Sequence, residues 1–521
     1  MADKQPRKWQ SKGFIPFRLE VLTPVFIGSG TTLSPLEYVI RKENGKNWLY
    51  FIDLQSWLME HASVQSVQNI IASGDIARIR RMLDEKVDAA TFAVNSSPIE
   101  DGTLADDLRQ AFGGQQNARG SFMKDKTGDV DAALRNPVDN YLYIPGSSLK
   151  GSISTPLIAW LDNLASKLGQ PSLKAADQKR GMQDRLKEFF GNINDHAMQA
   201  LKVSDVAAPF TACAVVRAKE RSQKPEKKGT PKNPCEAIMP DCGEMWGRLM
   251  LDSRSGTPAI TLPSGTRVSL PDLVRHCNAF YSKRFTNEMG KFYLLPHFKE
   301  TREALRSAEA KVMALGEDSM LLRIGHYSHV ESVTVDNNQP YTRNGKDGTP
   351  MPFGTTRTLA DGRLPFGWVI LHFCSLEDYE KGIQEAEMSR RAAVTAQRKH
   401  LLALRRKAEE KAAQAALLIR EQEERHRAAE QLAVEKQKKE EELARRMAEL
   451  LPEEARLLKL ETEPSEALSM EIFAEMKNWS PEFRRKAAEA LQVCWTALGK
   501  WSGKQSKKQE AKIKELKALL E

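Results

Sequence analysis

The sequence contains no long apolar run. None of its stretches reaches about 18 consecutive apolar residues, the length of a membrane-spanning helix. The first residues, Met1 to Trp9, are mostly polar or charged and lack the apolar core of a secretory signal peptide. Both absences predict a soluble, cytoplasmic protein with no membrane partner.

Cysteine is scarce and irregularly spaced. The six cysteines form no Cys-x-x-Cys motif, which favours free thiols in a reducing compartment. The combination that comes nearest to a zinc site joins Cys235, Cys242, His276 and Cys277, and their spacing matches no standard zinc finger. We therefore expect no metal and no other cofactor.

The Walker motif Gly-x-x-x-x-Gly-Lys-Ser/Thr is also absent. Instead, Tyr141 to Thr155 combines a short apolar strand, a Gly/Ser turn with one lysine, and the start of a helix. Free N–H groups and the helix dipole favour an anion at such a helix N-terminus. From the residues alone, a phosphate-contacting loop and an ordinary strand-to-helix connection stay equally open. The candidate residues are Gly146, Ser147, Ser148, Lys150 and Gly151.

Positive charge is in excess. The chain of 521 residues has a formal net charge of +9, which fits a nucleic-acid partner but equally fits simple solubility. A chain of this length should divide into roughly two to four structural units.

The N-terminal part predicts a β-rich α+β module. Residues 17–21 alternate apolar and charged side chains, which indicates a half-buried strand. A turn with Gly28 and Gly30 follows and exposes backbone donors, and the dipeptide Asn44-Gly45 is typical of a tight hairpin.

A polar insertion is expected at about 95–136, where Gly, Asp, Asn, Gln and Ser predominate. It is either a loop that grips nucleic acid or, more often for such a composition, a solvated loop. Its candidate contact residues are Arg119, Phe122, Lys124 and Lys126.

The following part again places strands before helices. Met320 to Gly325 predicts a strand that ends in a glycine, and two later glycine turns lead into further strands. The candidate residues at these turns are Arg323, Gly325, His326, Arg357 and Gly367.

A series of short motifs recurs along the chain: Ile144-Pro-Gly-Ser-Ser-Leu-Lys-Gly151, Phe189-Phe-Gly191 followed by Val203-Ser-Asp205, Leu322-Arg-Ile-Gly325, Thr356-Arg-Thr-Leu359 and Leu364-Pro-Phe-Gly-Trp-Val369. Together they resemble the motifs of the RAMP superfamily of CRISPR proteins, whose RRM-like modules grip guide RNA. Within it they resemble the family of the fifth subunit of type III-A Csm effector complexes. The resemblance spans about residues 14–373.

This resemblance implies an α+β fold with two ferredoxin-like, RRM-like RAMP modules at 1–215 and 216–375. It implies a noncatalytic subunit that binds CRISPR guide RNA (crRNA) and caps a type III effector ribonucleoprotein at the 3′ end of the guide, aiding crRNA maturation and assembly in antiviral defence. The implied partners are crRNA and other Csm-type subunits, above all the backbone RAMP subunit, with recruitment of a host nuclease left open. The residues implied in RNA binding are Gly28, Gly30, Gly146, Ser147, Ser148, Lys150, Gly151, Arg323, Gly325, His326, Arg357 and Gly367.

The chain departs from the family pattern at two points. The lysine motif continues as Lys150-Gly-Ser-Ile-Ser154, whereas family members commonly carry an arginine at the last position, so Lys150 must supply more of the charge. The target-cutting backbone subunits place an aspartate after the first glycine-rich turn. Here the segment Leu33 to Val39 holds Glu37 as its lone carboxylate, without a metal partner nearby in sequence, which disfavours catalysis.

An alternative function is a metal-independent repeat-RNA endoribonuclease. In it, His326 or His329 would act as general base and acid for RNA self-cleavage, since histidine has a suitable pKa for both roles. Two histidines at a strand end more often stack on bases or cap a loop.

The composition changes after Cys374. Residues 383–451 contain no Gly, Pro, Asn or Asp, which predicts one long helix of about 100 Å or a helical hairpin over 376–451. Its apolar positions keep no strict heptad, so a coiled coil and a solvated charged helix remain alternatives. Residues 452–521 predict a small helical region, with Ser480 as a helix N-cap and a basic tail from Lys500.

Overall fold

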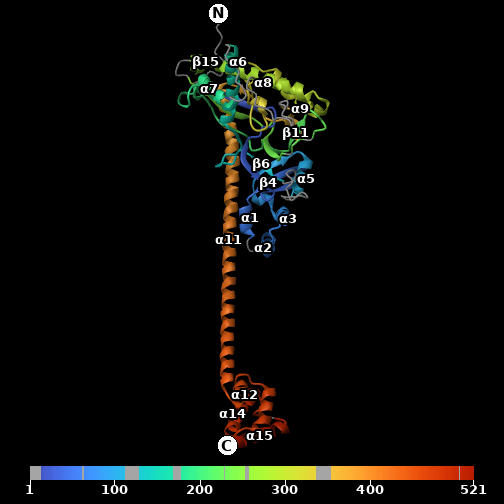
Figure 1. Ribbon diagram of the computed structural model, residues 1–521, viewed down its shortest axis with the longest axis vertical. Coiled ribbons are helices and arrows are strands. Elements are labelled where there is room, and N and C mark those ends of the chain that lie inside the picture. The colour runs from blue at the N-terminus through green and yellow to red at the C-terminus, as the bar shows by residue number, and fades with distance from the viewer. Residues whose placement is uncertain are drawn as a thin grey trace. The chain divides into compact units, whose positions relative to one another are not determined.

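The computed structural model describes residues 13–61, 64–111, 128–167, 178–227, 229–230, 232–252, 257–335, 354–503 and 505–521 (Figure 1). The chain divides into two units, Met1–Ala413 and Gln414–Glu521, and the long helix α11 (Leu376–Glu449) takes part in both. The four predicted contact residues of the polar insertion lie outside the described residues, and so does Lys504 of the basic tail.

The first unit is built around a five-stranded antiparallel sheet with the spatial order β16-β19-β1-β13-β8. The alternation predicted at 17–21 is confirmed as the central strand, in which Phe17 and Leu19 are buried. The strands are β1 (Ile15–Val21), β8 (Leu201–Val203), β13 (Met245–Leu251), β16 (Ser319–Arg323) and β19 (Trp368–Phe373).

This sheet has the ferredoxin-like strand order. Among β1, β8, β13 and β19, the fourth strand lies beside the first, then come the third and the second, and β16 is added at the edge. Helices α6 (Gly146–Lys167) and α8 (Leu270–Glu288) contact each other and the sheet. Helix α8 begins at a capping box in which Ser269 and Asp272 each accept a backbone hydrogen bond from the other.

A second, seven-stranded sheet has the order β2-β6-β12-β10-β5-β4-β3. The hairpin predicted from Asn44-Gly45 joins β3 to β4, and both turn residues have positive φ, 49° and 80°. The sheet comprises β2 (Gly28–Leu33), β3 (Tyr38–Glu43), β4 (Lys46–Ile52), β5 (Ala93–Ile99), β6 (Val130–Ala133), β10 (Cys213–Val216) and β12 (Cys235–Ile238).

The predicted fold class is therefore confirmed: the protein is α+β, with two β-sheet modules and a long helical extension. The five-stranded sheet takes strands from both sides of residue 215, and the predicted module boundary falls inside β10. The domain limits themselves stay a prediction.

Three smaller sheets complete the strands of the first unit. They pair β7 (Tyr143–Ile144) with β9 (Val206–Ala207), β11 (Ala218–Ser222) with β17 (Thr356–Ala360) and β18 (Leu364–Pro365), and β14 (Ala259–Thr261) with β15 (Arg267–Ser269).

The first part of α11 belongs to the core of the first unit. Leu404 is buried in one apolar cluster with Trp57 and Phe92. Lys407 Nζ lies 2.9 Å from Glu60 Oε1. The neighbouring helices are α1 (Leu54–Glu60), α2 (Gln65–Ala72), α3 (Ile76–Lys86) and α4 (Ala89–Phe92), and further helices of the unit are α5 (Gly102–Gln110), α7 (Gln178–Phe190), α9 (Lys299–Ala304) and α10 (Arg306–Met313).

Helix α11 is one continuous helix of 74 residues, so of the two predicted alternatives the hairpin is wrong. Residues 416–442 are exposed throughout, as in a solvated charged helix. Ion pairs four residues apart line its surface, among them Arg406 with Glu410 at 3.1 Å and Arg420 with Glu424 at 3.2 Å.

The second unit has its own small core, which includes Leu460, Ile472, Leu491 and Trp495. The Ser480 hydroxyl accepts a hydrogen bond from a backbone N–H of α14, which confirms the predicted N-cap. Its helices are α12 (Pro452–Thr462), α13 (Glu466–Glu475), α14 (Pro481–Ala497) and α15 (Lys507–Leu520). Over the part of the chain that the structure describes, no helix combines the length and apolar character needed to cross a membrane.

Candidate nucleic-acid interface

The predicted lysine turn forms the first turns of helix α6. The helix begins at Gly146, earlier than the apolar spacing from Leu157 onward indicates. Leu149 and Ile153 explain this start, because they precede Leu157 at intervals of four residues and all three side chains are buried in the main core. The Gly/Ser residues are therefore held in helical conformation by packing rather than by their own preference.

Gly146 is enclosed by the protein itself. Its N–H donates a 2.7 Å hydrogen bond to Asp205 Oδ1. A Cβ at Gly146 would lie 2.1 Å from the carbonyl oxygen of Val203, so the glycine admits the backbone that follows β8. The Asp205 carboxylate thus lies where a phosphate would bind the N–H at the start of this helix, because a carboxylate satisfies the same N–H and helix dipole.

Lys150 lies on the exposed side of this helix start. Burial, followed by the charge of Lys202, lowers the pKa of Lys150. Ser147 and Gly151 are exposed, and a Cβ at Gly151 would meet no atom within 4 Å. Two lysines and an open glycine therefore form the part of the motif that a phosphate can reach. Lys202 was not predicted from the sequence. Its position directly before the Val203-Ser-Asp205 motif is the signal that could have identified it.

The other glycine turns converge at the end of β16. A Cβ at Gly325 would lie 2.5 Å from the carbonyl oxygen of Phe26, and one at Gly367 would lie 2.3 Å from that of Ile324. The Gly367 N–H also donates to Pro24 O at 2.9 Å. These glycines are required because three chain segments approach one another closely.

A hydrogen bond connects these glycine turns to helix α6, which carries Lys150. The Ser152 hydroxyl of α6 donates a 3.0 Å hydrogen bond to the carbonyl oxygen of Arg323, two residues before Gly325. The first glycine turn lies on exposed β2, where Gly30 has a φ of 82° and a Cβ there would meet nothing within 4 Å. A Cβ at Gly28 would lie 3.2 Å from the Phe26 ring.

An aromatic platform accompanies these turns. Tyr327 stacks on Phe26 with ring centroids 6.1 Å apart, and Lys232 Nζ lies 5.3 Å from the Tyr327 ring. His326 meets the Phe26 ring edge-on at 5.8 Å. Phe26 is buried, but Tyr327 is partly exposed and His326 is exposed, and two such rings with a lysine suit stacking on unpaired bases.

Arg323 and Arg357 take a different position from the one predicted. Each is only 3% exposed. Arg323 forms an ion pair with Glu288 of α8, and Arg357 Nε lies 3.5 Å from Glu288 Oε1. Arg357 Nη2 also lies 2.9 Å from Glu331 Oε1. Because both guanidinium groups neutralise buried or half-buried carboxylates, they do not present free charge to an RNA phosphate.

The two arginines keep the buried carboxyl group of Glu288 ionised. Burial raises the pKa of its carboxyl, but the charges of Arg323 and Arg357 outweigh burial and hold the pKa at about 2. The cluster is thus an ion network inside the protein.

The predicted catalytic histidines do not form an acid–base pair. Burial, followed by the charges of Arg323 and Arg357, lowers the pKa of His329 to about 3. Its Nε2 accepts a 3.1 Å hydrogen bond from the Thr358 N–H. At neutral pH the His329 ring is therefore neutral and lacks the imidazolium proton that a general acid transfers. His326 is exposed, and partial desolvation followed by the charge of Lys232 lowers its pKa.

The remaining candidates have local partners. Glu37 Oε2 accepts a 2.8 Å hydrogen bond from the Ser34 N–H and so closes a turn. Cys235 lies in β12 and Cys277 in α8, both fully buried, and His276 stacks on Trp160. Among the described residues, no group of three or more His, Cys, Asp or Glu side chains is arranged to hold a metal ion.

Comparison with known proteins agrees with the resemblance to the RAMP superfamily that the sequence motifs predict. Residues 18–239 match the family model described as the RAMP superfamily. The search of curated proteins found no match.

Two solved structures are similar to the chain, each with 18% sequence identity. A chain in a cryo-EM structure of a Csm–crRNA–target RNA ternary complex of a type III-A CRISPR-Cas system has a TM-score of 0.47, covering 69% of this chain and 100% of that one. The crystal structure of Csm5 from T. onnurineus has a TM-score of 0.44, covering 68% of this chain and 99% of that one. The family match confirms the predicted resemblance to the RAMP superfamily over residues 18–239.

Proposed function

We propose that this protein is a noncatalytic, crRNA-binding subunit of a cytoplasmic type III CRISPR effector ribonucleoprotein. It caps the effector at the 3′ end of the guide and aids crRNA maturation and complex assembly in antiviral defence. Its protein partners are other Csm-type subunits, above all the backbone RAMP subunit that it would adjoin. A host nuclease recruited for maturation is a further partner of this proposal.

One observation carries the proposal. The motifs that resemble the RAMP pattern lie far apart in sequence, yet the turns around Phe26, Gly325 and Gly367 are in direct backbone contact, and the Ser152 hydroxyl of α6 bonds to the carbonyl oxygen of Arg323 beside them. These links support the proposal that exposed glycine backbone, Lys150 with Lys202 and the aromatic platform contact one RNA strand. Those groups suit phosphate contacts and base stacking, neither of which reads base sequence.

The structure narrows the residues proposed to touch RNA. Arg323 and Arg357 are left out because their charges are used internally. Gly146 and Gly367 are left out because both are buried and their N–H groups donate to Asp205 and to Pro24 O. The retained residues are Gly28, Gly30, Ser147, Ser148, Lys150, Gly151, Gly325 and His326, to which Lys202 is added.

Lys150→Ala is expected to weaken guide-RNA binding by about 1–2 kcal/mol, the size of one charge-assisted hydrogen bond to a phosphate. The slope of log affinity against log salt should become shallower by about 0.7, the value for one lost contact on single-stranded RNA. Filter binding at several salt concentrations measures both quantities. Lys202→Ala should behave similarly.

Lys46→Ala provides the matched control, because Lys46 is an exposed lysine on strand β4, away from the motifs. Two guides with unrelated spacer sequences should bind equally well. The proposal fails if Lys150→Ala leaves affinity and salt slope at the wild-type values, or if affinity follows the spacer sequence.

Purified protein is expected to leave repeat RNA intact in EDTA, because the His329 ring is neutral at neutral pH and accepts the Thr358 N–H, so the two histidines do not supply an acid–base pair. Gel analysis of end-labelled RNA is the measurement. Cleavage that persists in EDTA and disappears in His326→Ala would overturn the noncatalytic assignment and restore the endonuclease alternative.

A further inference from the structure

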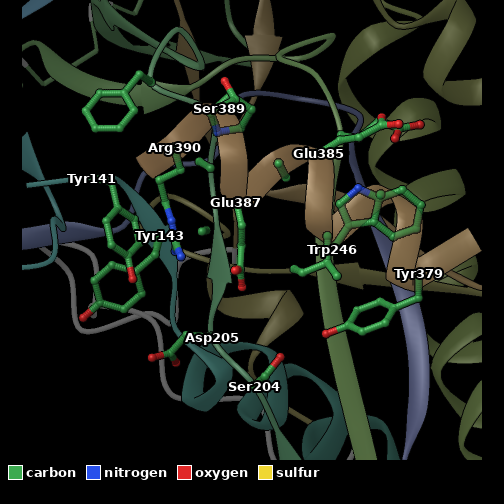
Figure 2. Close-up of a pocket in the computed structure, with 18 of the residues that line it drawn as sticks. Tyr141, Tyr143, Ser204, Asp205, Trp246, Tyr379, Glu385, Glu387, Ser389 and Arg390 are labelled. Atoms are coloured by element: carbon green, nitrogen blue, oxygen red, sulfur yellow. The ribbon is translucent and has the colours of Figure 1, made fainter. Parts of the chain in front are cut away.

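A pocket of about 460 Å³ lies between the RAMP core and the first turns of α11 (Figure 2). Such a volume lies within the range of sites that take small molecules, roughly 300–1,000 Å³. Its walls come from the segment around β7, from β13 and from α11. The motifs that carry the RAMP resemblance end before α11, so the pocket depends on the extension.

Aromatic side chains form two walls of the pocket. Tyr141 and Tyr143 lie on one side, and Trp246 and Tyr379 lie on the other (Figure 2). The two tyrosines contact each other edge-on at 6.3 Å, and Trp246 contacts Tyr379 in the same way at 6.4 Å. A flat aromatic ligand can stack on either wall.

A glycine brings α11 against this pocket. A Cβ at Gly382 would lie 2.2 Å from ring atoms of Trp246. Any other residue would push the helix off the indole, because neither the ring nor the helix backbone can yield by that much. The wall is thus built into the fold of the first unit.

The polar groups exclude a phosphate as the occupant. The lining holds four carboxylates and two guanidinium groups, an excess of two negative charges. Arg390 already lies over the Tyr141 ring, with its central carbon 4.7 Å from the ring centroid. The charged groups are Asp205, Glu244, Glu385, Glu387, Arg248 and Arg390.

A neutral nucleobase satisfies both features. Carboxylates such as Glu387 accept hydrogen bonds from exocyclic amino groups, while Arg390 and the Ser389 hydroxyl can donate to ring nitrogen and carbonyl acceptors. The phosphates of the same strand would stay outside, where Lys150 and Lys202 supply positive charge. Asp205 connects the two places, since it lines the pocket and accepts the hydrogen bond of the Gly146 N–H.

From this arrangement we propose that the pocket holds one unpaired base of bound single-stranded RNA, stacked on Tyr143. At this one nucleotide it favours a base with an exocyclic amino group over uracil, whereas the rest of the strand is bound without regard to base sequence. This inference rests on the proposed function, because it requires that RNA binds at the neighbouring lysines. It adds a base-binding site to an otherwise phosphate-directed interface.

The test titrates the full chain with single-stranded RNA octamers that each carry 2-aminopurine at a different position. We expect strong quenching of 2-aminopurine fluorescence at one position, where the base stacks on tyrosine. Tyr143→Leu should abolish that quenching and weaken binding about tenfold, as expected for one lost base–aromatic stack. Tyr143→Phe should keep both, because it retains the ring face.

Tyr50→Leu is the matched control, since Tyr50 is a partly exposed strand tyrosine outside the pocket. RNA that binds without quenching at any position would overturn the base site and leave the proposed function standing. Absence of RNA binding would overturn both. An arginine octapeptide whose binding requires Tyr143, while RNA binding does not, would overturn the base assignment and give the pocket to a basic segment of a partner protein.

Discussion

Glu288→Gln is expected to lower the free energy of unfolding of the first unit by about 3–5 kcal/mol, the cost of removing one partner from a buried ion pair. Glutamine has nearly the shape of glutamate but no charge. Arg323 and Arg357 would then share a buried site in which the carboxylate of Glu331 still pairs with Arg357, while Arg323 has lost its ion pair with Glu288. Their mutual repulsion would no longer be balanced.

Denaturant unfolding followed by tryptophan fluorescence and circular dichroism measures this loss. The second unit has a separate core, so its transition should stay where it is and serve as an internal reference. Glu303→Gln is the matched control, because Glu303 is an exposed helical glutamate of α9 and its change should stay within about 0.5 kcal/mol. A loss below about 1 kcal/mol for Glu288→Gln would show that the network contributes little.

The same carboxylate gives a pH signature. Its pKa falls from an ordinary value of 4.5 to about 2 in the folded protein. A carboxyl with a depressed pKa contributes stability that is fully present above pH 4.5 and is lost as the pH falls toward 2. The wild-type protein should therefore lose stability over this interval more steeply than Glu288→Gln. Parallel acid titrations of the two proteins would contradict the assignment.

Local patterns explain which elements could be predicted from the sequence. The alternation at 17–21 determines β1 because one face of the strand is buried, and Asn44-Gly45 determines its hairpin because both residues tolerate positive φ. The start of α6 could not be predicted in this way. It depends on burial of Leu149 and Ile153 against strands that lie distant in sequence.

In the candidate site, too, some features follow from local sequence and others depend on residues that are distant in sequence. The motif resemblance located the glycine turns and Lys150, and the structure joins them through backbone contacts. The burial of Arg323 could not be anticipated, because its partner Glu288 lies 35 residues away on another element. An arginine beside a glycine turn has the same local sequence whether it faces a phosphate or a carboxylate.

The extension was predicted as a helix, but its role in the first unit follows from tertiary contacts. Gly382 is the residue that ties α11 to Trp246, and Leu404 fills the cluster around Trp57. Neither position stands out in a composition dominated by Ala, Glu, Lys and Arg.

Truncation after Phe373 is expected to leave the first unit folded but less stable by at least about 2–5 kcal/mol, the cost of deleting one buried leucine. The unit should fold because β19 is complete at the cut. It should be less stable because the intact protein buries both Leu404, 4% exposed, and Trp246, 9% exposed. The deletion removes Leu404 and also removes Gly382 of α11, which packs against the Trp246 ring.

Truncation after Ala413 is the matched control. It retains Tyr379, Gly382 and Leu404, so the unfolding transition of the first unit should shift by less than about 0.5 kcal/mol. Circular dichroism would report the fold, and a red shift of tryptophan emission in the shorter protein would report exposure of Trp246. Equal stability of the two truncated proteins would contradict a structural role of residues 374–413.

The two truncated proteins also separate two contributions to RNA binding. Both lack the basic helix α15, so both should bind guide RNA less tightly than the full chain at moderate salt and show a shallower salt slope. Only the protein ending at Phe373 lacks the α11 wall of the pocket, so it alone should lose quenching of 2-aminopurine. If the protein ending at Ala413 lost the quenching as well, the pocket would need residues beyond those that line it, because every lining residue precedes Ala413.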